Sequence, residues 1–364
     1  MANEITAMRK LRFIRCNIGE ESYGLDMSWV RSIQRADQIK PVAELKPRFL
    51  ADKSKNDVEA DERTGFFDEA RNRIGWLPAE DGDIPVYSLA SRLGRTTTTL
   101  ASYGRVVVLN PVIIISNRPW ALLVDRVSQV VEISSEQLVP LPALVNCSSS
   151  NYFRGAIRLE EELVLLLAPE LVHPDAAPRA RQSPNAALRP ATDFKNHVPS
   201  APPVFSDTKK KARRDKQILL FSTSDPVPGE RALSFALSIT QVPEILNTAQ
   251  LTRVPGAPSF VLGLINWRNR LVPVIDLNAR LGLRSAEGWR NERSRLLIVR
   301  SSGESKTDVY AGLVIRPTIR ALRLPVAYKP CQSSPVIEKH FVSGIIELEK
   351  ETVAIPDLPQ ILRY

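Results

Sequence analysis

The chain has 364 residues, with 49 Lys and Arg against 40 Asp and Glu and a formal net charge of +9. That length allows two ordinary domains, each with its own apolar core. No apolar run approaches the roughly 20 residues of a membrane helix, and the opening MANEITAMRKLRF lacks the apolar core of a signal peptide. Cys16, Cys147 and Cys331 are too few and too far apart for a disulfide framework, so we expect a cytoplasmic protein with reduced cysteines.

The excess positive charge is concentrated in one segment. Residues 1–173 carry 21 Lys and Arg against 23 Asp and Glu, residues 174–214 carry 9 against 3, and residues 215–364 carry 19 against 14. The middle segment is rich in Pro, Ala and Ser and ends in KKKARR, which predicts a flexible basic linker. Such a short basic run is usually solvated, and the alternative is a contact with nucleic acid or a membrane surface.

Short apolar strands are predicted along both halves. In the first half, we expect an opening strand at 11–18 (LRFIRCNI) and a hairpin of two apolar strands around a polar turn within 105–133. An insertion at about 40–70 predicts a polar loop followed by a short amphipathic helix. The second half repeats the opening strand at 217–223 and the hairpin at 295–322. Frequent short strands separated by turn residues predict an all-β protein.

The two halves are copies of one repeat, and repeats of this kind decide how a fold is interpreted. IPVYSLASRLG in the first copy matches VPVIDLNARLG in the second. Gly75 precedes Pro85 by ten residues and Gly263 precedes Pro273 by ten, so the spacing holds without a gap. The matched segments are 21–35 with 233–247, 84–94 with 272–282, 105–133 with 295–322, and 152–157 with 341–346.

Three segments of the chain resemble the CheW family, the adaptors of bacterial chemotaxis. VPGAPSFVLGLINWRNRLVPVIDLNARLG at 254–282 combines a Val-Pro-Gly turn, a Gly-x-x-Asn-x-Arg turn and a Pro-Val-x-Asp-Leu strand. LLVDRVSQVVEISSEQLVPLP at 122–142 and SNYFRGAI at 150–157 resemble the later part of the same domain. The chain therefore resembles two CheW-like domains in tandem, at 8–173 and 215–364, joined by the linker at 174–214.

The resemblance implies an all-β fold in which each domain consists of two small five-stranded β-barrels around a shared core. It implies a non-enzymatic scaffold without a cofactor or metal. The expected partners are the cytoplasmic tips of chemoreceptors, the regulatory domain of a CheA-type histidine kinase and other CheW-like proteins. The expected location is the cytoplasm at membrane-associated receptor arrays, with only an indirect contact to the membrane.

The resemblance also implies a partner-binding groove in which Glu244 and Arg268 face each other. Such a pair would hold the guanidinium at a fixed angle with donors left over for a partner. The alternative is an ordinary surface ion pair, worth about 0 to 1 kcal/mol. We expect Trp267 to be an exposed apolar contact, or else to cover the end of the barrel. The candidate partner-binding residues are Val30, Gly75, Asp125, Gly155, Val242, Glu244, Gly263, Asn266, Trp267, Arg268, Gly312 and Gly344.

The copies depart from the family pattern in different places. Ser32 and Glu80 stand in the first copy where the second has Glu244 and Arg268, and Glu80 belongs to an acidic cluster with Asp81 and Asp83. Downstream, the family's Val-Asp is kept at Asp125 but is replaced in the second copy by Val314-Ile315. These differences predict that the two copies are specialised for different partners.

Three functions are alternatives to a kinase-activating adaptor. The three histidines, His173, His197 and His340, lie at no metal-ligand spacing, and the chain has no phosphate-binding loop or nucleophile elbow, which argues against an enzyme. A small barrel with Trp267 between basic residues could instead bind single-stranded nucleic acid. A third alternative is a CheW-like competitor that modulates the kinase rather than activating it.

Overall fold

The computed structural model describes thirteen stretches of the chain, namely residues 10–41, 73–95, 104–111, 117–145, 152–159, 162–173, 217–225, 233–284, 294–302, 308–325, 329–330, 337–348 and 351–363. Within these stretches, no helix is long and apolar enough to cross a membrane. The predicted linker at 174–214 and residues 42–70 of the predicted insertion lie outside the described residues.

In its described residues, the first copy forms two sheets, A and B, with two short α-helices. Its opening strand and its later hairpin lie where the sequence predicts them. The strands are β1 (Lys10–Ile18), β2 (Glu21–Asp26), β3 (Val30–Arg35), β4 (Lys40–Pro41), β5 (Arg73–Leu77), β6 (Ile84–Ser88), β7 (Arg105–Leu109), β8 (Trp120–Val124), β9 (Arg126–Ser134), β10 (Leu138–Val139), β11 (Phe153–Leu159) and β12 (Glu162–Leu167). The α-helices are α2 (Leu89–Arg92) and α3 (Pro169–Val172).

The second copy forms sheets C and D from the corresponding segments. Its strands are β13 (Gln217–Phe221), β14 (Leu233–Ser238), β15 (Glu244–Leu246), β16 (Val261–Trp267), β17 (Arg270–Ile275), β18 (Arg295–Ser302), β19 (Asp308–Ile315), β20 (Ile319–Arg323), β21 (Lys329–Pro330), β22 (Val342–Leu348) and β23 (Glu351–Pro356). The α-helices are α4 (Leu277–Arg280) and α5 (Leu358–Ile361). One-turn 3-10 helices, such as η5 (Ile239–Gln241) before β15, connect some strands.

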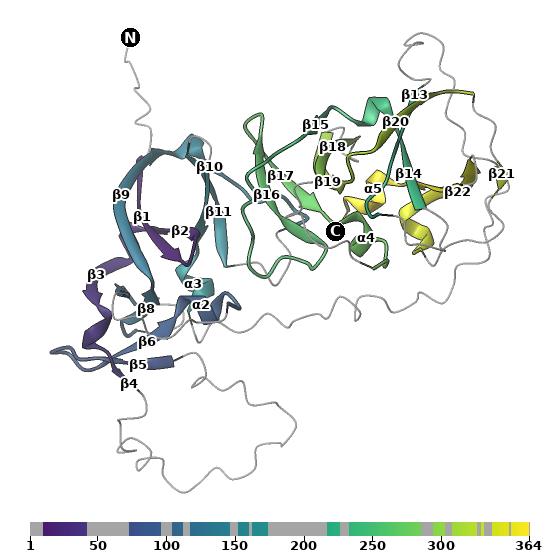
Figure 1. Cartoon of the computed structure of the whole chain (residues 1–364). Helices are drawn as coiled ribbons and strands as arrows, with labels where there is room; N and C mark the ends of the chain where they lie inside the picture. Colours follow the sequence, from purple (N-terminus) through teal and green to yellow (C-terminus); the bar gives the residue numbers. More distant parts are fainter. Residues whose placement is uncertain are drawn as a thin grey trace, which may run out of the picture. The chain divides into compact units, whose positions relative to one another are not determined.

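Both copies have the same topology (Figure 1). Sheet A has the order β10-β11-β12-β2-β1-β9, and sheet C repeats it as β21-β22-β23-β14-β13-β20. Sheet B has the order β3-β7-β8-β6-β5-β4, and sheet D repeats its first five strands as β15-β18-β19-β17-β16. The predicted hairpins are confirmed, because β7 pairs antiparallel with β8 and β18 with β19. The chain of each copy starts in one sheet, crosses to the other and returns.

The predicted all-β class is confirmed, but the predicted closed five-stranded barrels are not. Each sheet has five strands of at least three residues, and sheets A, B and C add a two-residue strand at one edge. No ladder among the described residues joins the two edge strands of a sheet. Closure requires edge strands to exchange hydrogen bonds, and the two-residue strands β4, β10 and β21 each pair with a single neighbour.

Each sheet covers an apolar cluster of its own. The cluster of sheet B includes Leu77, Val106 and Val108, and that of sheet D includes Leu296 and Ile298, all at most 1% exposed. Sheets A and C cover equivalent clusters. Successive residues of β7, Val106 to Leu109, are all at most 1% exposed, so both faces of that strand are covered. Buried runs rather than strict alternation are typical of strands at the centre of such a fold.

In each copy, an arginine of the repeated motif links its own helix to the last helix of that copy. Arg92 donates to the carbonyls of Val172 (3.1 Å) and His173 (2.8 Å). In the second copy, Arg280 donates to the carbonyls of Ile361 (3.2 Å) and Arg363 (2.7 Å). The orphan carbonyls at the end of a short helix are thereby satisfied.

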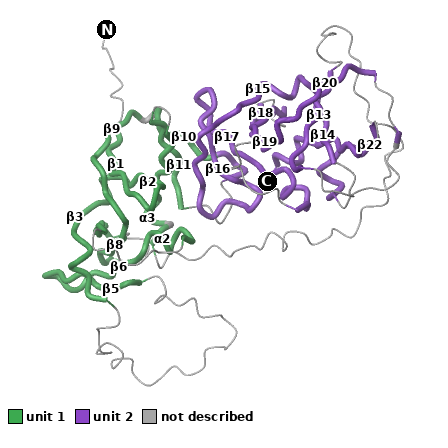
Figure 2. Tube along the Cα trace, viewed as in Figure 1, with its two compact units in different colours: residues 1–141, 149–180 green, residues 142–148, 181–364 purple. Residues whose placement is uncertain are grey.

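The chain divides into two compact units, which Figure 2 colours separately. Unit 1 consists of residues 1–141 and 149–180, and unit 2 of residues 142–148 and 181–364. The division falls within the predicted linker, near residue 180. It also assigns residues 142–148 of the first copy to the second unit, which the sequence repeat does not predict.

Candidate partner-binding site

The hairpin of β16 and β17 carries most of the predicted site. Its strands pair as far as Trp267 with Arg270, so Arg268 and Asn269 alone form the turn. Both have positive φ angles, 48° and 62°. Two-residue hairpin turns of type I′ require positive φ at both positions, and Asn accepts it more readily than Arg. The turn therefore projects the Arg268 side chain from a tip whose backbone is closely defined.

The predicted contact between Glu244 and Arg268 is confirmed. A guanidinium nitrogen of Arg268 lies 2.9 Å from Oε2 of Glu244 on the neighbouring segment β15. The same carboxylate oxygen accepts a hydrogen bond of 2.9 Å from Nε1 of Trp267. The carboxylate is thus fixed by two donors. The Arg268 side chain is 67% exposed, so most of its five N–H donors face solvent.

The prediction that Trp267 is an exposed contact is wrong. Trp267 is 7% exposed and packs in the apolar cluster of sheet D beside Ile265 and Val272. It lies two residues after Ile265 on β16, and alternate strand residues share a face. Its burial agrees with the alternative, that Trp267 covers the end of the barrel. An exposed stacking ring, which the nucleic-acid interpretation needs, is therefore not supplied by Trp267.

Sequence reasoning missed a second layer of the same tip. The guanidinium of Arg268 lies over the Trp267 ring at 5.0 Å, and that of Arg270 lies over the Tyr310 ring at 4.9 Å. The two rings contact each other at 5.3 Å. We call Trp267, Arg268, Arg270 and Tyr310 the arginine platform. Tyr310 is brought in by β19, which pairs with β17, so only the register of the sheet reveals it.

Four of the predicted glycines have a structural role at bulges in the strands. Gly75, Gly155, Gly263 and Gly344 all lie at register shifts, in β5, β11, β16 and β22. A Cβ at Gly263 would lie 2.5 Å from the carbonyl oxygen of Thr252, and one at Gly155 would lie 2.7 Å from that of Val139. The bulges let an edge segment approach closely. A partner contact at these glycines stays a prediction.

The remaining candidates of the second copy lie in different surroundings. Gly312 is buried in the middle of sheet D against Leu296, which gives it a packing role, and a partner contact at this residue stays a prediction. Val242 is half-buried where η5 ends. Asn266 is half-buried, and its amide oxygen is shielded from solvent without a hydrogen-bond partner in the described chain.

Strand pairing confirms that Ser32 occupies the place of Glu244. Ser32 pairs with Val108 on β7, as Glu244 pairs with Ile298 on β18. Val30, which matches Val242, is half-buried at the start of β3. In this copy, the hairpin strands end earlier, at the pair of Leu77 and Ile84.

The first copy's hairpin ends in a longer loop of opposite charge. We call residues 78–83 (PAEDGD) the acidic loop, and all six are exposed. Asp81 lies 3.6 Å from Arg31 of β3. In the second copy, the strand supplies the acid and the turn supplies the arginine. In the first copy, the strand supplies the arginine, Arg31, and the loop supplies the acid, Asp81.

A second site also differs in charge between the copies. Its strand pairing corrects the sequence alignment by one residue. Ala121 of β8 and Gly312 of β19 pair with matching residues, so Asp125 corresponds to Arg316 and not to Ile315. Asp125 accepts a hydrogen bond of 2.6 Å from the backbone N–H of Gly19. At the same corner, Arg316 lies 3.0 Å from the carboxylate of Asp225. A fold contact thus accounts for Asp125, and a partner role for it stays a prediction.

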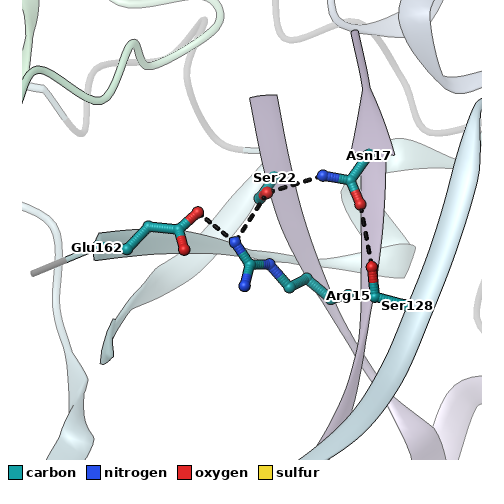
Figure 3. A network of polar contacts seen from close by, with 5 residues as sticks. All are labelled: Arg15, Asn17, Ser22, Ser128 and Glu162. Carbon is teal, nitrogen blue, oxygen red and sulfur yellow. Dashed lines mark hydrogen bonds and ion pairs between the residues drawn. The ribbon is translucent and has the colours of Figure 1, made fainter. Parts of the chain in front are cut away.

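A polar network ties four strands of sheet A together (Figure 3). Arg15 of β1 binds the carboxylate of Glu162 on β12 and donates to Oγ of Ser22 on β2 at 3.2 Å. Asn17 donates to the same Ser22 at 2.9 Å and accepts from Ser128 of β9 at 3.3 Å. In the second copy, Glu351 similarly binds Arg320 and Ser234, which indicates a shared role in the fold.

The titratable groups show no arrangement of catalytic type in the described stretches. Burial raises the pKa of the Cys16 thiol to about 12, so it stays protonated near neutral pH and is a poor nucleophile. No group of three or more His, Cys, Asp or Glu among the described residues is placed to hold a metal ion.

The fold and the hairpin tips define the class of the protein. It is a duplicated all-β protein with a charged surface at one hairpin of each copy. A family model described as CheW-like domain matches residues 71–176 and 218–364, which together exceed half of the chain. The chain belongs to the CheW-like domain family and carries that domain twice.

Each individual relative matches a stretch about as long as one copy of the repeat. The chain is 29% identical over 131 residues to "Chemotaxis protein CheW" of Rhizobium meliloti (strain 1021), covering 35% of this chain and 79% of that protein. It is 33% identical over 134 residues to "Chemotaxis protein CheW" of Helicobacter pylori (strain ATCC 700392 / 26695), covering 35% and 74%. It is 30% identical over 118 residues to "Protein PilI" of Pseudomonas aeruginosa, covering 32% and 62%.

A solved structure also matches. It is described as the scaffolding protein TtCheW from Thermoanaerobacter tengcongensis, is 26% identical, and covers 41% of this chain and 88% of that chain with a TM-score of 0.33.

Proposed function

We propose that this protein is a non-enzymatic scaffold of a chemotaxis-type signal transduction system. It couples the cytoplasmic tips of chemoreceptors to the regulatory domain of a CheA-type histidine kinase, in the cytoplasm at membrane-associated receptor arrays. Membership of the CheW-like family and the names of the relatives support this role. It works through protein contacts and needs no cofactor.

The observation that carries the proposal is the fixed tip of the β16–β17 hairpin. Glu244 holds Arg268 at 2.9 Å while the Arg268 side chain stays 67% exposed. A guanidinium that is already oriented loses little side-chain entropy when it binds a carboxylate or carbonyl. The exposed pair itself is worth only about 0 to 1 kcal/mol of folding free energy. Its value is therefore greater for recognition than for stability.

The charge exchange Arg268→Glu and Glu244→Arg tests this role. We expect each single variant to weaken binding to a receptor cytoplasmic fragment about tenfold, because the oriented cation is lost or repelled. We expect the double exchange to recover part of that loss. Glu244→Gln is the matched control, since it can still accept from Trp267 but removes the ion pair. Calorimetric titration measures binding, and thermal unfolding checks the fold. Unchanged binding in both single variants would contradict the proposal.

We also propose that the two copies serve different partners. The second copy keeps the Glu244 and Arg268 pair, whereas the first places Ser32 and the exposed acidic loop at the same positions. A receptor or kinase surface that needs a guanidinium cannot bind a carboxylate there in the same way. Such a protein could activate the kinase or compete with its usual adaptor.

Variants of the full chain can separate the copies. Lysine replacements in the acidic loop alter the first copy, and Arg268→Glu alters the second. Pull-downs with the kinase regulatory domain and with the receptor fragment should show different losses for the two variants. Identical losses of both partners would show that the copies are not specialised.

A further inference from the structure

The two copies present opposite charges at equivalent hairpin tips. The β5–β6 and β16–β17 hairpins share the same register, since Leu77 pairs with Ile84 as Ile265 pairs with Val272. Beyond this point, the second copy continues for two more pairs and ends in the arginine platform. The first copy instead ends in the acidic loop. Every molecule therefore carries one tip of each sign.

The arginine platform is built to receive carboxylates. Stacking on Trp267 and Tyr310 holds the guanidinium planes of Arg268 and Arg270 while leaving their N–H edges in solvent. Only Glu244 forms an ion pair with either arginine among the described residues. Glu244 pairs with Arg268, and the Asp308 carboxylate near Tyr310 lies 3.5 Å from Arg300, so Arg270 is left as an excess positive charge at the tip.

The acidic loop offers the complementary groups. Glu80, Asp81 and Asp83 lie within four successive residues and are all exposed. The Asp81 side chain is 86% exposed even though it lies near Arg31. Neither Glu80 nor Asp83 forms an ion pair with a described residue. The loop thus carries two carboxylates, Glu80 and Asp83, that the described residues do not pair with a cation.

We propose that the acidic loop of one molecule binds the arginine platform of a second copy of this chain. The two surfaces have complementary charge, and each chain presents both of them in equal number. The contact joins two different surfaces, so it is heterologous and links molecules head to tail. This inference does not depend on the receptor or kinase partners proposed above.

Such a contact is dominated by exposed charges, which sets its expected behaviour. Exposed ion pairs are individually weak and are screened as ionic strength rises. We therefore expect association at low salt that declines at high salt. Repetition of the contact along a row of molecules would strengthen it through high local concentration.

Sedimentation velocity of the full chain tests the proposal directly. The average mass should rise with protein concentration at about 20 mM salt and return toward the monomer at about 500 mM salt, where the Debye length is only a few ångströms. Two variants should stay monomeric throughout. One carries Arg268→Glu and Arg270→Glu, and the other carries Glu80→Lys, Asp81→Lys and Asp83→Lys. The loop variant changes only exposed residues, so it keeps the test valid if the platform variant is unstable.

Mixing the two variants gives the decisive arm. Each variant alone brings like charges together, whereas a mixture pairs acidic platforms with basic loops and native platforms with native loops. We expect the mixture to associate where neither variant does. The control variant Arg284→Glu with Arg323→Glu makes the same charge change at exposed sites on other elements and should associate like the unaltered protein.

Two results would overturn the proposal. One is a chain that remains monomeric at low salt and high concentration. This includes the case in which the variants change only the hydrodynamic radius of the monomer, because that result would indicate docking within one chain. The other is association that neither variant reduces.

Discussion

At the scale of single residues, Arg280 illustrates how one repeated side chain holds segments that are distant in sequence. Besides its two bonds to the carbonyls of Ile361 and Arg363, its guanidinium lies 4.3 Å from the centre of the Phe260 ring and 4.5 Å from that of Phe341. Charged hydrogen bonds and cation–π contacts are among the stronger single contributions in proteins.

We predict that Arg280→Ala lowers the free energy of unfolding by about 2 to 4 kcal/mol, because it removes charged hydrogen bonds and both ring contacts. Arg280→Lys should recover only part of this loss, since an ammonium lacks the planar fork that reaches two carbonyls. Denaturant unfolding measures both values. Arg284→Ala, at an exposed position on the same segment, serves as the control, and an equal effect there would refute the prediction.

At the scale of elements, one device recurs in all four sheets. A strand shifts register at a glycine, and in three of these strands a carbonyl of an edge segment lies against the missing side chain, at Lys40, Val139 and Thr252. A bulge increases local twist and bends a strand. The device explains why the glycine spacing is the same in the two copies, because the edge segment can approach only where there is no Cβ.

We predict that Gly263→Ala destabilises the protein by about 1 to 3 kcal/mol, because the new Cβ overlaps the Thr252 carbonyl and the Leu251 side chain. The loss should appear as a lower denaturant midpoint with an unchanged slope. Ser343→Ala, an exposed change beside the equivalent bulge of β22, is the control. A Gly263→Ala protein as stable as the control would show that the close approach has no energetic weight.

At the scale of the whole molecule, two compact units each contain buried apolar clusters. Units with separate cores unfold independently unless their interface is large and apolar. Leu77 of unit 1 and Leu296 of unit 2 are both fully buried. They provide a matched pair of leucines for testing independence.

We predict that Leu77→Ala and Leu296→Ala each cost about 2 to 5 kcal/mol, and that each lowers a different thermal transition. Differential scanning calorimetry of the full chain should show one transition shifted and the other unchanged in each variant. A single transition that moves in both variants would mean that the units unfold together.

Much of the site could be predicted from the sequence, for identifiable reasons. The repeat predicts that Ser32 occupies the position in the first copy that Glu244 occupies in the second, and strand pairing confirms it. The contact of Glu244 with Arg268 followed from the family resemblance and is confirmed by distance. Trp267 was misjudged because its neighbours in the chain are polar, whereas its neighbours in space are the apolar residues of sheet D.

The sequence by itself determined the duplication, the all-β class, the position of the strands and the sign of charge at each hairpin tip. These properties are periodic or local, so they are visible along the chain. Only the tertiary structure decided that no ladder among the described residues closes a sheet, that Tyr310 supports Arg270, and that Arg316 takes the place of Asp125. These facts depend on which strands lie side by side and in which register, and residues far apart in the chain set both.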